Sequence, residues 1–63
     1  MNKPTTITED MQQWTDKGLI HREDGPARMF LKTKVCEWWL NGIFYTSGEM
    51  LNDELFQSYL WKE

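Results

Sequence analysis

Residues 35–46 read VCEWWLNGIFYT, and this stretch decides the fold. Its centre, Asn41-Gly42, is the dipeptide most typical of a two-residue β-hairpin turn, because asparagine and glycine tolerate the positive φ angles that its type I′ form needs at both central positions. Apolar and aromatic residues flank the dipeptide on both sides. The stretch therefore predicts two antiparallel strands, residues 35–40 and 43–46. A two-residue turn would oppose Leu40 to Ile43, Trp39 to Phe44 and Trp38 to Tyr45.

The preceding segment shows further turn signals at short intervals. Residues 11–15 and 19–22 flank Asp16-Lys17-Gly18, a polar loop that ends in glycine and is typical of a hairpin. Residues 23–26, EDGP, predict a second turn in which the glycine supplies a positive φ angle. Residues 27–31 then alternate as a half-buried strand does, and a third turn follows.

Apolar residues recur at helical spacing after this segment: Met50, Leu51, Leu55, Phe56, Tyr59 and Leu60. Asn52 suits the N-cap position, while Ser47 is a rival cap that would start the helix earlier. Leu51 and Phe56 match a hydrophobic staple. We expect a helix over about residues 50–61, with its apolar stripe on one face of the sheet.

The first ten residues are polar and rich in threonine, and we expect a loose arm that enters the first strand in an extended conformation. A short helix capped by Thr6 and Glu9 is the alternative, although so short a helix is costly to nucleate. The expected fold is a single α+β domain, a four- to five-stranded antiparallel β-meander with one C-terminal helix packed on one face. Its parts are an N-terminal arm (1–10), β-hairpin repeats (11–46) and the C-terminal helix (47–63).

The composition fits a small domain in a reducing compartment. The chain has 63 residues, and its 14% aromatic content supplies the large side chains that so short a chain needs for a core. Cys36 is the single cysteine, so no internal disulfide can form. No signal-peptide core precedes the domain, and the apolar runs, such as residues 38–40, reach three residues at most, which is too short to span a membrane. These features predict a cytoplasmic protein without membrane contact.

The charge is unevenly distributed around a net value of -3. Residues 17–34 hold five basic against two acidic residues, whereas residues 35–63 hold one basic against five acidic residues. Residues 1–16 hold one basic residue against three acidic residues. A basic centre between acidic ends argues against DNA mimicry, and the acidic total argues against a dedicated nucleic-acid binder.

The two predicted hairpins follow a common plan. Residues 14–21 and residues 39–45 each begin with tryptophan and continue with a polar turn ending in glycine, two apolar residues and a ring. The loop differs by one residue, so we interpret the pattern as a degenerate duplication whose units stack on each other.

Two ordered strings carry a resemblance: GLIHREDGPA at residues 18–27 and EWWLNG at residues 37–42. They resemble the short hairpin repeats of many small proteins of tailed bacteriophages, which are loosely similar to MORN-type repeats. The resemblance covers roughly residues 12–46 and ends at YTSG, residues 45–48, where another HREDG is expected. It implies a phage origin, the host cytoplasm and a β-hairpin architecture, and it implies no activity.

The residue types needed for catalysis or metal binding do not gather in this sequence, so we expect no enzyme, cofactor or metal. His21 is the single histidine, and we expect it to join residues 22–24 in a local turn network. Cys36 is expected to be a small buried hydrophobe, and a reactive thiol is the less favoured alternative.

Basic and aromatic side chains make up the candidate partner surface. Alternation places Arg28, Phe30 and Lys32 on one face of a strand, and that face stays open if the helix covers the other. Such a face is typical of a protein-binding hot spot and of a platform for single-stranded nucleic acid, although a merely solvated face has the same composition. Trp61 either flanks the core or projects outward. The candidate partner-binding residues are Arg22, Arg28, Phe30, Lys32, Lys34, Trp38 and Trp61.

These observations favour a non-enzymatic interaction protein. It would bind a host protein or complex, such as a defence nuclease or the transcription machinery, and inhibit or redirect it by steric occlusion. Its anchors would be Arg22, Arg28, Phe30 and Trp38. Binding of single-stranded nucleic acid through the same face is the second hypothesis, and a structural repeat domain is the third. Homo-oligomerisation is compatible with each of them.

Overall fold

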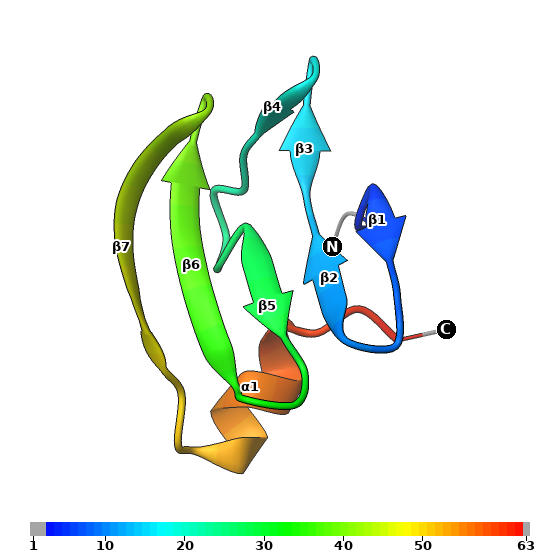
Figure 1. Ribbon diagram of the computed structural model, residues 1–63, viewed down its shortest axis with the longest axis vertical. Helices are drawn as coiled ribbons and strands as arrows, with labels where there is room; N and C mark the ends of the chain where they lie inside the picture. The colour runs from blue at the N-terminus through cyan, green and yellow to red at the C-terminus, as the bar shows by residue number, and fades with distance from the viewer. Residues whose placement is uncertain (1–2, 63) are drawn as a thin grey trace.

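The computed structural model describes residues 3–62, so the ends of the expected arm and helical tail, residues 1, 2 and 63, lie outside the described part. Five strands form an antiparallel sheet in the order β1-β2-β5-β6-β7, and β3 pairs with β4 in a two-stranded sheet (Figure 1). The predicted α+β meander with a C-terminal helix is confirmed. The elements are β1 (Thr6–Ile7), β2 (Met11–Gln13), β3 (Thr15–Asp16), β4 (Leu19–Ile20), β5 (Arg28–Phe30), β6 (Val35–Leu40), β7 (Ile43–Glu49) and α1 (Asp53–Tyr59).

Two hairpin turns share one backbone conformation. The φ angles are 53° and 81° at residues 17 and 18, and 51° and 78° at residues 41 and 42. Positive φ at both central positions defines a two-residue turn of type I′, so the turn predicted at Asn41-Gly42 is correct. The first loop is one residue shorter than predicted, because Asp16 pairs with Leu19 and belongs to β3.

Because the two turns have the same length, the two hairpins align in the structure differently from the alignment predicted from the sequence. Trp14 lies three residues before the first turn, and Trp38 lies three residues before the second. Trp14 is therefore equivalent to Trp38 and not, as the sequence suggested, to Trp39. Trp14 is buried, and Trp38 packs against the same core.

The pairing of β6 with β7 contains a β-bulge. The predicted pairs Leu40 with Ile43 and Trp39 with Phe44 are present. The register then shifts, so that Trp38 faces Thr46 and the prediction of Tyr45 as its partner is wrong. Tyr45 is the extra residue that a bulge inserts into one strand of a pair.

Helix α1 is shorter than predicted at both ends. Asn52 caps it, because the Asn52 side chain accepts a hydrogen bond from the backbone N–H of Leu55 at 3.0 Å. The rival cap, Ser47, lies within β7. Leu51 is 78% exposed while Phe56 is buried, so the predicted hydrophobic staple between them is wrong.

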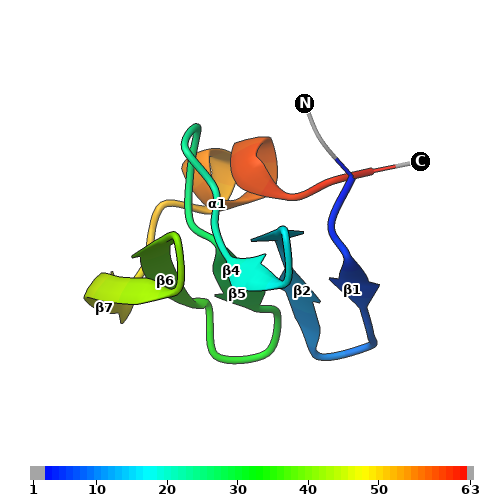
Figure 2. The ribbon, with the colours of Figure 1, turned by 90° about the horizontal axis from the view of Figure 1, so that it is seen from above.

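The core lies between the sheet and α1, which covers one face of the sheet (Figure 2). Trp14, Met29, Cys36 and Phe56 form it. The loop between β4 and β5 lies on the same side of the sheet as α1 (Figure 2). Within this loop a Cβ on Gly25 would lie 2.7 Å from Tyr59 Cδ1. Gly25 does not have a positive φ angle, so the predicted reason for this glycine is wrong. The close approach of the Tyr59 ring is what requires it.

The arm is more ordered than predicted. Strand β1 lies within it, and Thr6 pairs with Gln13 of β2. The extended entry is therefore correct, and the alternative of a short helix starting at Thr6 is wrong. In the described range 3–62, no helix is long and apolar enough to cross a membrane.

Candidate protein-binding surface

The basic side chains of the predicted surface are engaged in ion pairs. The pairs are Arg22 with Asp24, Arg28 with Glu37, Lys32 with Asp10, and Lys34 with Asp53. Three of the four acidic partners lie far from the basic residue in sequence or on another strand, so composition alone does not reveal the pairing. The surface is consequently much less basic than its lysines and arginines suggested.

Arg22 is an interior residue, and its predicted role as a surface anchor is wrong. Its side chain is 3% exposed, and its guanidinium lies 3.9 Å from the centre of the Trp14 ring. It donates hydrogen bonds to Asp24 Oδ1 at 2.9 Å and to the carbonyl of Pro26 at 3.1 Å. The hydrogen bond from Arg22 holds the pKa of Asp24 below its ordinary value. Arg22 therefore fastens the loop between β4 and β5 to the core.

Arg28 and Phe30 lie on the sheet face opposite α1, as predicted, because Met29 between them is fully buried in the core. Arg28 is nevertheless held in place from both sides. Its Nε donates to Gln13 Oε1 at 2.9 Å, and its Nη1 donates to Glu37 Oε1 at 3.2 Å. Lys32 follows β5, and its side chain is 76% exposed.

Trp39 is, with Phe30, a large aromatic residue of this uncovered face. Its Nε1 donates to Glu37 Oε1 at 3.0 Å, and the guanidinium of Arg28 lies 5.5 Å from its ring centre. Its ring meets that of Phe44 edge to face, with centroids 5.4 Å apart. Trp39 was not among the predicted partner-binding residues, although the predicted pairing with Phe44 already placed it beside an exposed aromatic.

Trp38 and Trp61 belong to the covered side. Trp38 shares the face of Cys36 and packs against the core, so its predicted place beside Arg28 and Phe30 is wrong. Trp61 flanks the core, which decides between the two positions considered for it. Lys34 completes the predicted set, and it bonds Asp53 at the start of α1.

His21 and Cys36 both contribute to the fold, His21 through a hydrogen bond and Cys36 through burial in the core. His21 Nδ1 accepts a hydrogen bond from the backbone N–H of Asn41 at 3.0 Å, so His21 links the two hairpin turns and not the loop 22–24 predicted for it. Cys36 is fully buried as predicted, and burial raises the pKa of its thiol. Among residues 3–62, no three His, Cys, Asp or Glu side chains are grouped to hold a metal ion.

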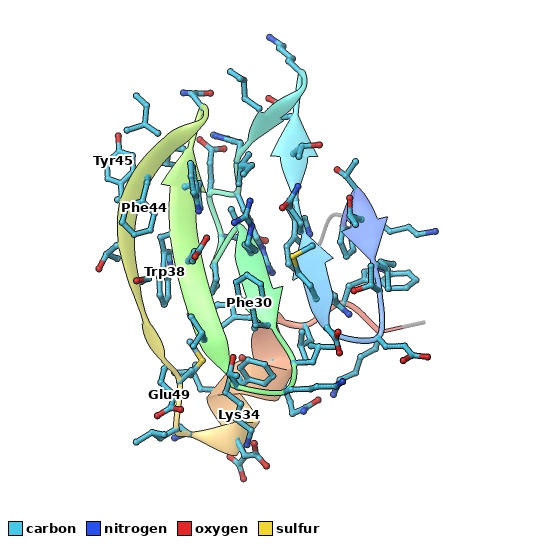
Figure 3. The ribbon with its side chains drawn as sticks, viewed as in Figure 1. Phe30, Lys34, Trp38, Phe44, Tyr45 and Glu49 are labelled. Carbon is cyan, nitrogen blue, oxygen red and sulfur yellow. The ribbon has the colours of Figure 1, made fainter. Side chains whose placement is uncertain are left out.

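The outer edge of β7 is a surface that the sequence reasoning missed. β7 is last in the strand order, hydrogen-bonded to β6 on one side and to no described strand on the other. All seven of its residues are exposed. Ile43 and Tyr45 are each 59% exposed and Phe44 is 49% exposed. Figure 3 shows Phe44 and Tyr45 on β7, the outermost strand. β1, the strand at the other edge, has only two residues.

A cleft of about 290 Å³ adjoins this edge. Leu40, Trp38 and Trp39 line it from β6, and Tyr45 and Thr46 line it from β7. The loop between β4 and β5 supplies the remaining wall through Arg22 and Glu23. The apolar edge of β7 and this cleft together form the candidate protein-binding surface.

Comparison of the chain with protein-family models, with curated protein sequences and with solved structures finds no match.

Proposed function

We propose that this chain is a non-enzymatic interaction protein that binds another protein through the outer edge of β7. One observation supports the proposal most directly: a seven-residue edge strand with three large exposed apolar side chains and a single charged residue, Glu49. An edge strand presents backbone N–H and C=O groups to any strand that lies beside it. Proteins usually protect such edges with lysines, prolines, short strands or β-bulges. The residues from Ile43 to Gly48 include no lysine and no proline, and the strand is long, so the bulge at Tyr45 is the one such protection in this stretch.

Binding would follow the mode in which an extended partner segment adds a strand to a sheet. Backbone hydrogen bonds to β7 give affinity, and the side chains of Ile43, Phe44 and Tyr45 add apolar contact. An interface of standard size takes about 800 Å² from each partner. That is about a fifth of the 4307 Å² surface of the described chain, so one partner would cover much of one side of the molecule.

The mechanism we propose is steric occlusion. A bound β7 edge occupies a segment of the partner that can then no longer pair or bind elsewhere. In view of the resemblance to phage hairpin repeats, we propose a host protein or complex in the cytoplasm as the partner, such as a defence nuclease or the transcription machinery.

The other two hypotheses have less support. Binding of single-stranded nucleic acid needs accessible positive charge, whereas Arg22, Arg28, Lys32 and Lys34 each pair with a carboxylate. A purely structural repeat domain gives no reason for an apolar edge strand left uncovered. We therefore place both below protein binding.

A capture experiment with matched variants tests the proposal. The tagged chain is incubated with host lysate, and the same is done with Ile43→Lys, with Tyr45→Lys and with Leu51→Lys as the control. Leu51 is an exposed apolar residue outside the edge, so its replacement introduces the same charge elsewhere. We expect a stoichiometric protein to be retained by the wild type and the control. The two edge variants should bind it about tenfold more weakly, the factor that corresponds to about 1.4 kcal/mol.

Circular dichroism of each variant verifies that the sheet is intact. Equal retention by all four chains, or the absence of any stoichiometric protein, would contradict the proposal.

A further inference from the structure

The cleft adjoins the part of β7 with which a partner strand would pair. Tyr45 and Thr46 belong both to the edge strand and to the wall of the cleft. Side chains of an added strand point alternately to the two faces of the sheet. Those on the side of α1 therefore approach the cleft from the edge.

Only a long side chain of the partner strand can extend along this cleft to its far wall. Neighbouring strands are about 4.8 Å apart, and Arg22 bonds β6 on the side away from β7. A partner side chain must therefore extend over β7 and toward β6, where the side chain of Glu23 lines the opposite wall. Trp38, Leu40 and Tyr45 line the path. Aromatic and apolar walls of this kind suit the alkyl stem of lysine or arginine, whose charged end then lies beyond the stem.

Glu23 lies at the far wall of the cleft, and it is exposed. Within residues 3–62 it takes part in no ion pair, unlike the four carboxylates paired with arginine or lysine. The neighbouring Arg22 does not neutralise Glu23, because the Arg22 guanidinium is turned inward over Trp14 and bonded to Asp24. Glu49, at the other end of β7, likewise takes part in no ion pair within this range.

We infer that the segment added to β7 carries a lysine or arginine whose alkyl stem lies in the cleft and whose cationic group pairs with Glu23. The inference rests on the proposed function, since it requires a strand at β7. Charge complementarity favours this partner over a second copy of the chain. A second copy would bring the same unpaired Glu23 and Glu49 and a further net charge of -3.

A random-peptide library displayed on yeast supplies the probe. Peptides are selected on the wild-type chain, and the strongest is synthesised with its recurrent basic residue as lysine, norleucine or glutamate. Norleucine keeps the alkyl stem and removes the charge. We expect lysine or arginine to be enriched at one position and the norleucine peptide to bind about fivefold more weakly, the loss expected for a partly exposed ion pair.

Variants of the chain assign the charge contact. Glu23→Gln should weaken the lysine peptide by the same factor and leave the norleucine peptide unchanged, which isolates the pair interaction. Glu23→Lys should reverse the preference in favour of the glutamate peptide. Glu54→Gln, at an exposed carboxylate of α1 that has no ion pair in residues 3–62, is the control and should change nothing.

The outcomes separate the inference from the proposed function. Peptides that lose binding to Ile43→Lys but bind Glu23→Gln as well as the wild type would overturn the inference and leave the edge assignment in place. Peptides indifferent to Ile43→Lys, or a selection that yields none, would overturn both. A dimer in solution that Ile43→Lys converts to a monomer would assign the edge to a second copy and also overturn the inference.

Discussion

Arg22 shows how a charged residue in a turn signature becomes an interior residue. The string HREDGP is polar and indicates a turn, and the turn is present. Nothing in the string indicates that Arg22 lies over Trp14 and near Tyr59, at 3.9 Å and 5.8 Å from the ring centres. Those contacts depend on how the loop returns over the sheet and where α1 ends. The local part of the structure was predictable, and the long-range part was not.

The ion pair of Arg22 with Asp24 makes stability depend on pH. The hydrogen bond from Arg22 is the main cause that lowers the pKa of Asp24 in the folded chain from its ordinary value of 3.8. Ionised Asp24 therefore stabilises the fold above pH 3.8, and this contribution is lost as the pH falls through the folded-state pKa. The effect is moderate, because the Asp24 side chain is 60% exposed.

Urea unfolding at a series of pH values measures this contribution. We expect the wild-type midpoint to fall between about pH 5 and pH 2, and the fall to be smaller in Asp24→Asn. Glu54→Gln, which removes a carboxylate that has no ion pair in residues 3–62, should follow the wild type. If Asp24→Asn also followed the wild type, the ion pair would not contribute to the free energy of unfolding.

At the scale of elements, the turns were the most predictable features. Asn41-Gly42 alone established the β6–β7 hairpin and its first two pairs. The bulge at Tyr45 could not be predicted, because no residue type demands an extra residue at that point. The register also shows that the two hairpins contact Arg28 through equivalent residues. Gln13 precedes Trp14 as Glu37 precedes Trp38, and both bond Arg28 from opposite sides of β5.

Helix α1 depends on its cap more than a long helix would. It has seven residues, and Phe56 is the one that is buried. Short helices are costly to nucleate, and the side chain of Asn52 satisfies the N–H of Leu55. We expect Asn52→Ala to lower the free energy of unfolding by about 1 kcal/mol.

Urea unfolding measures that loss, with Gln57→Ala as the control. Gln57 is exposed in the same helix, and its replacement by a better helix former should leave stability unchanged or slightly raised. Equal stability of the two variants would show that the cap does not support the helix.

At the scale of the whole molecule, the site was harder to predict than the fold. The face of Arg28 and Phe30 was assigned correctly, because strand alternation alone decides it. The charge of this face was not predicted correctly, because the acidic partners are distant in sequence: Glu37 lies on a neighbouring strand and Asp10 lies before β2. The open edge of β7 depends on the strand order, and no sequence pattern in one chain specifies which strand comes last.

Gln12 ties the end of the chain to the sheet. It is 8% exposed on β2, at a position where an apolar residue would be expected. Its side chain donates to the carbonyl of Trp61 at 3.1 Å and accepts from the N–H of Trp61 at 2.9 Å. Gln12 thereby satisfies both backbone groups of a residue 49 positions away, and the Trp61 ring can pack beside the core. Lys3 lies 5.3 Å from the centre of that ring, so this contact also reaches the N-terminal arm.

We expect Gln12→Ala to lower the free energy of unfolding by about 1–3 kcal/mol, because it leaves two backbone groups of Trp61 without their partner. The loss should be local at first, so chymotrypsin should cleave after Tyr59 and after Trp61 faster in this variant at native pH. Gln57→Ala, which removes an exposed glutamine, controls for side-chain loss in both measurements. A variant with wild-type stability and wild-type cleavage rates would mean that the two ends are held by the packing of Trp61 alone.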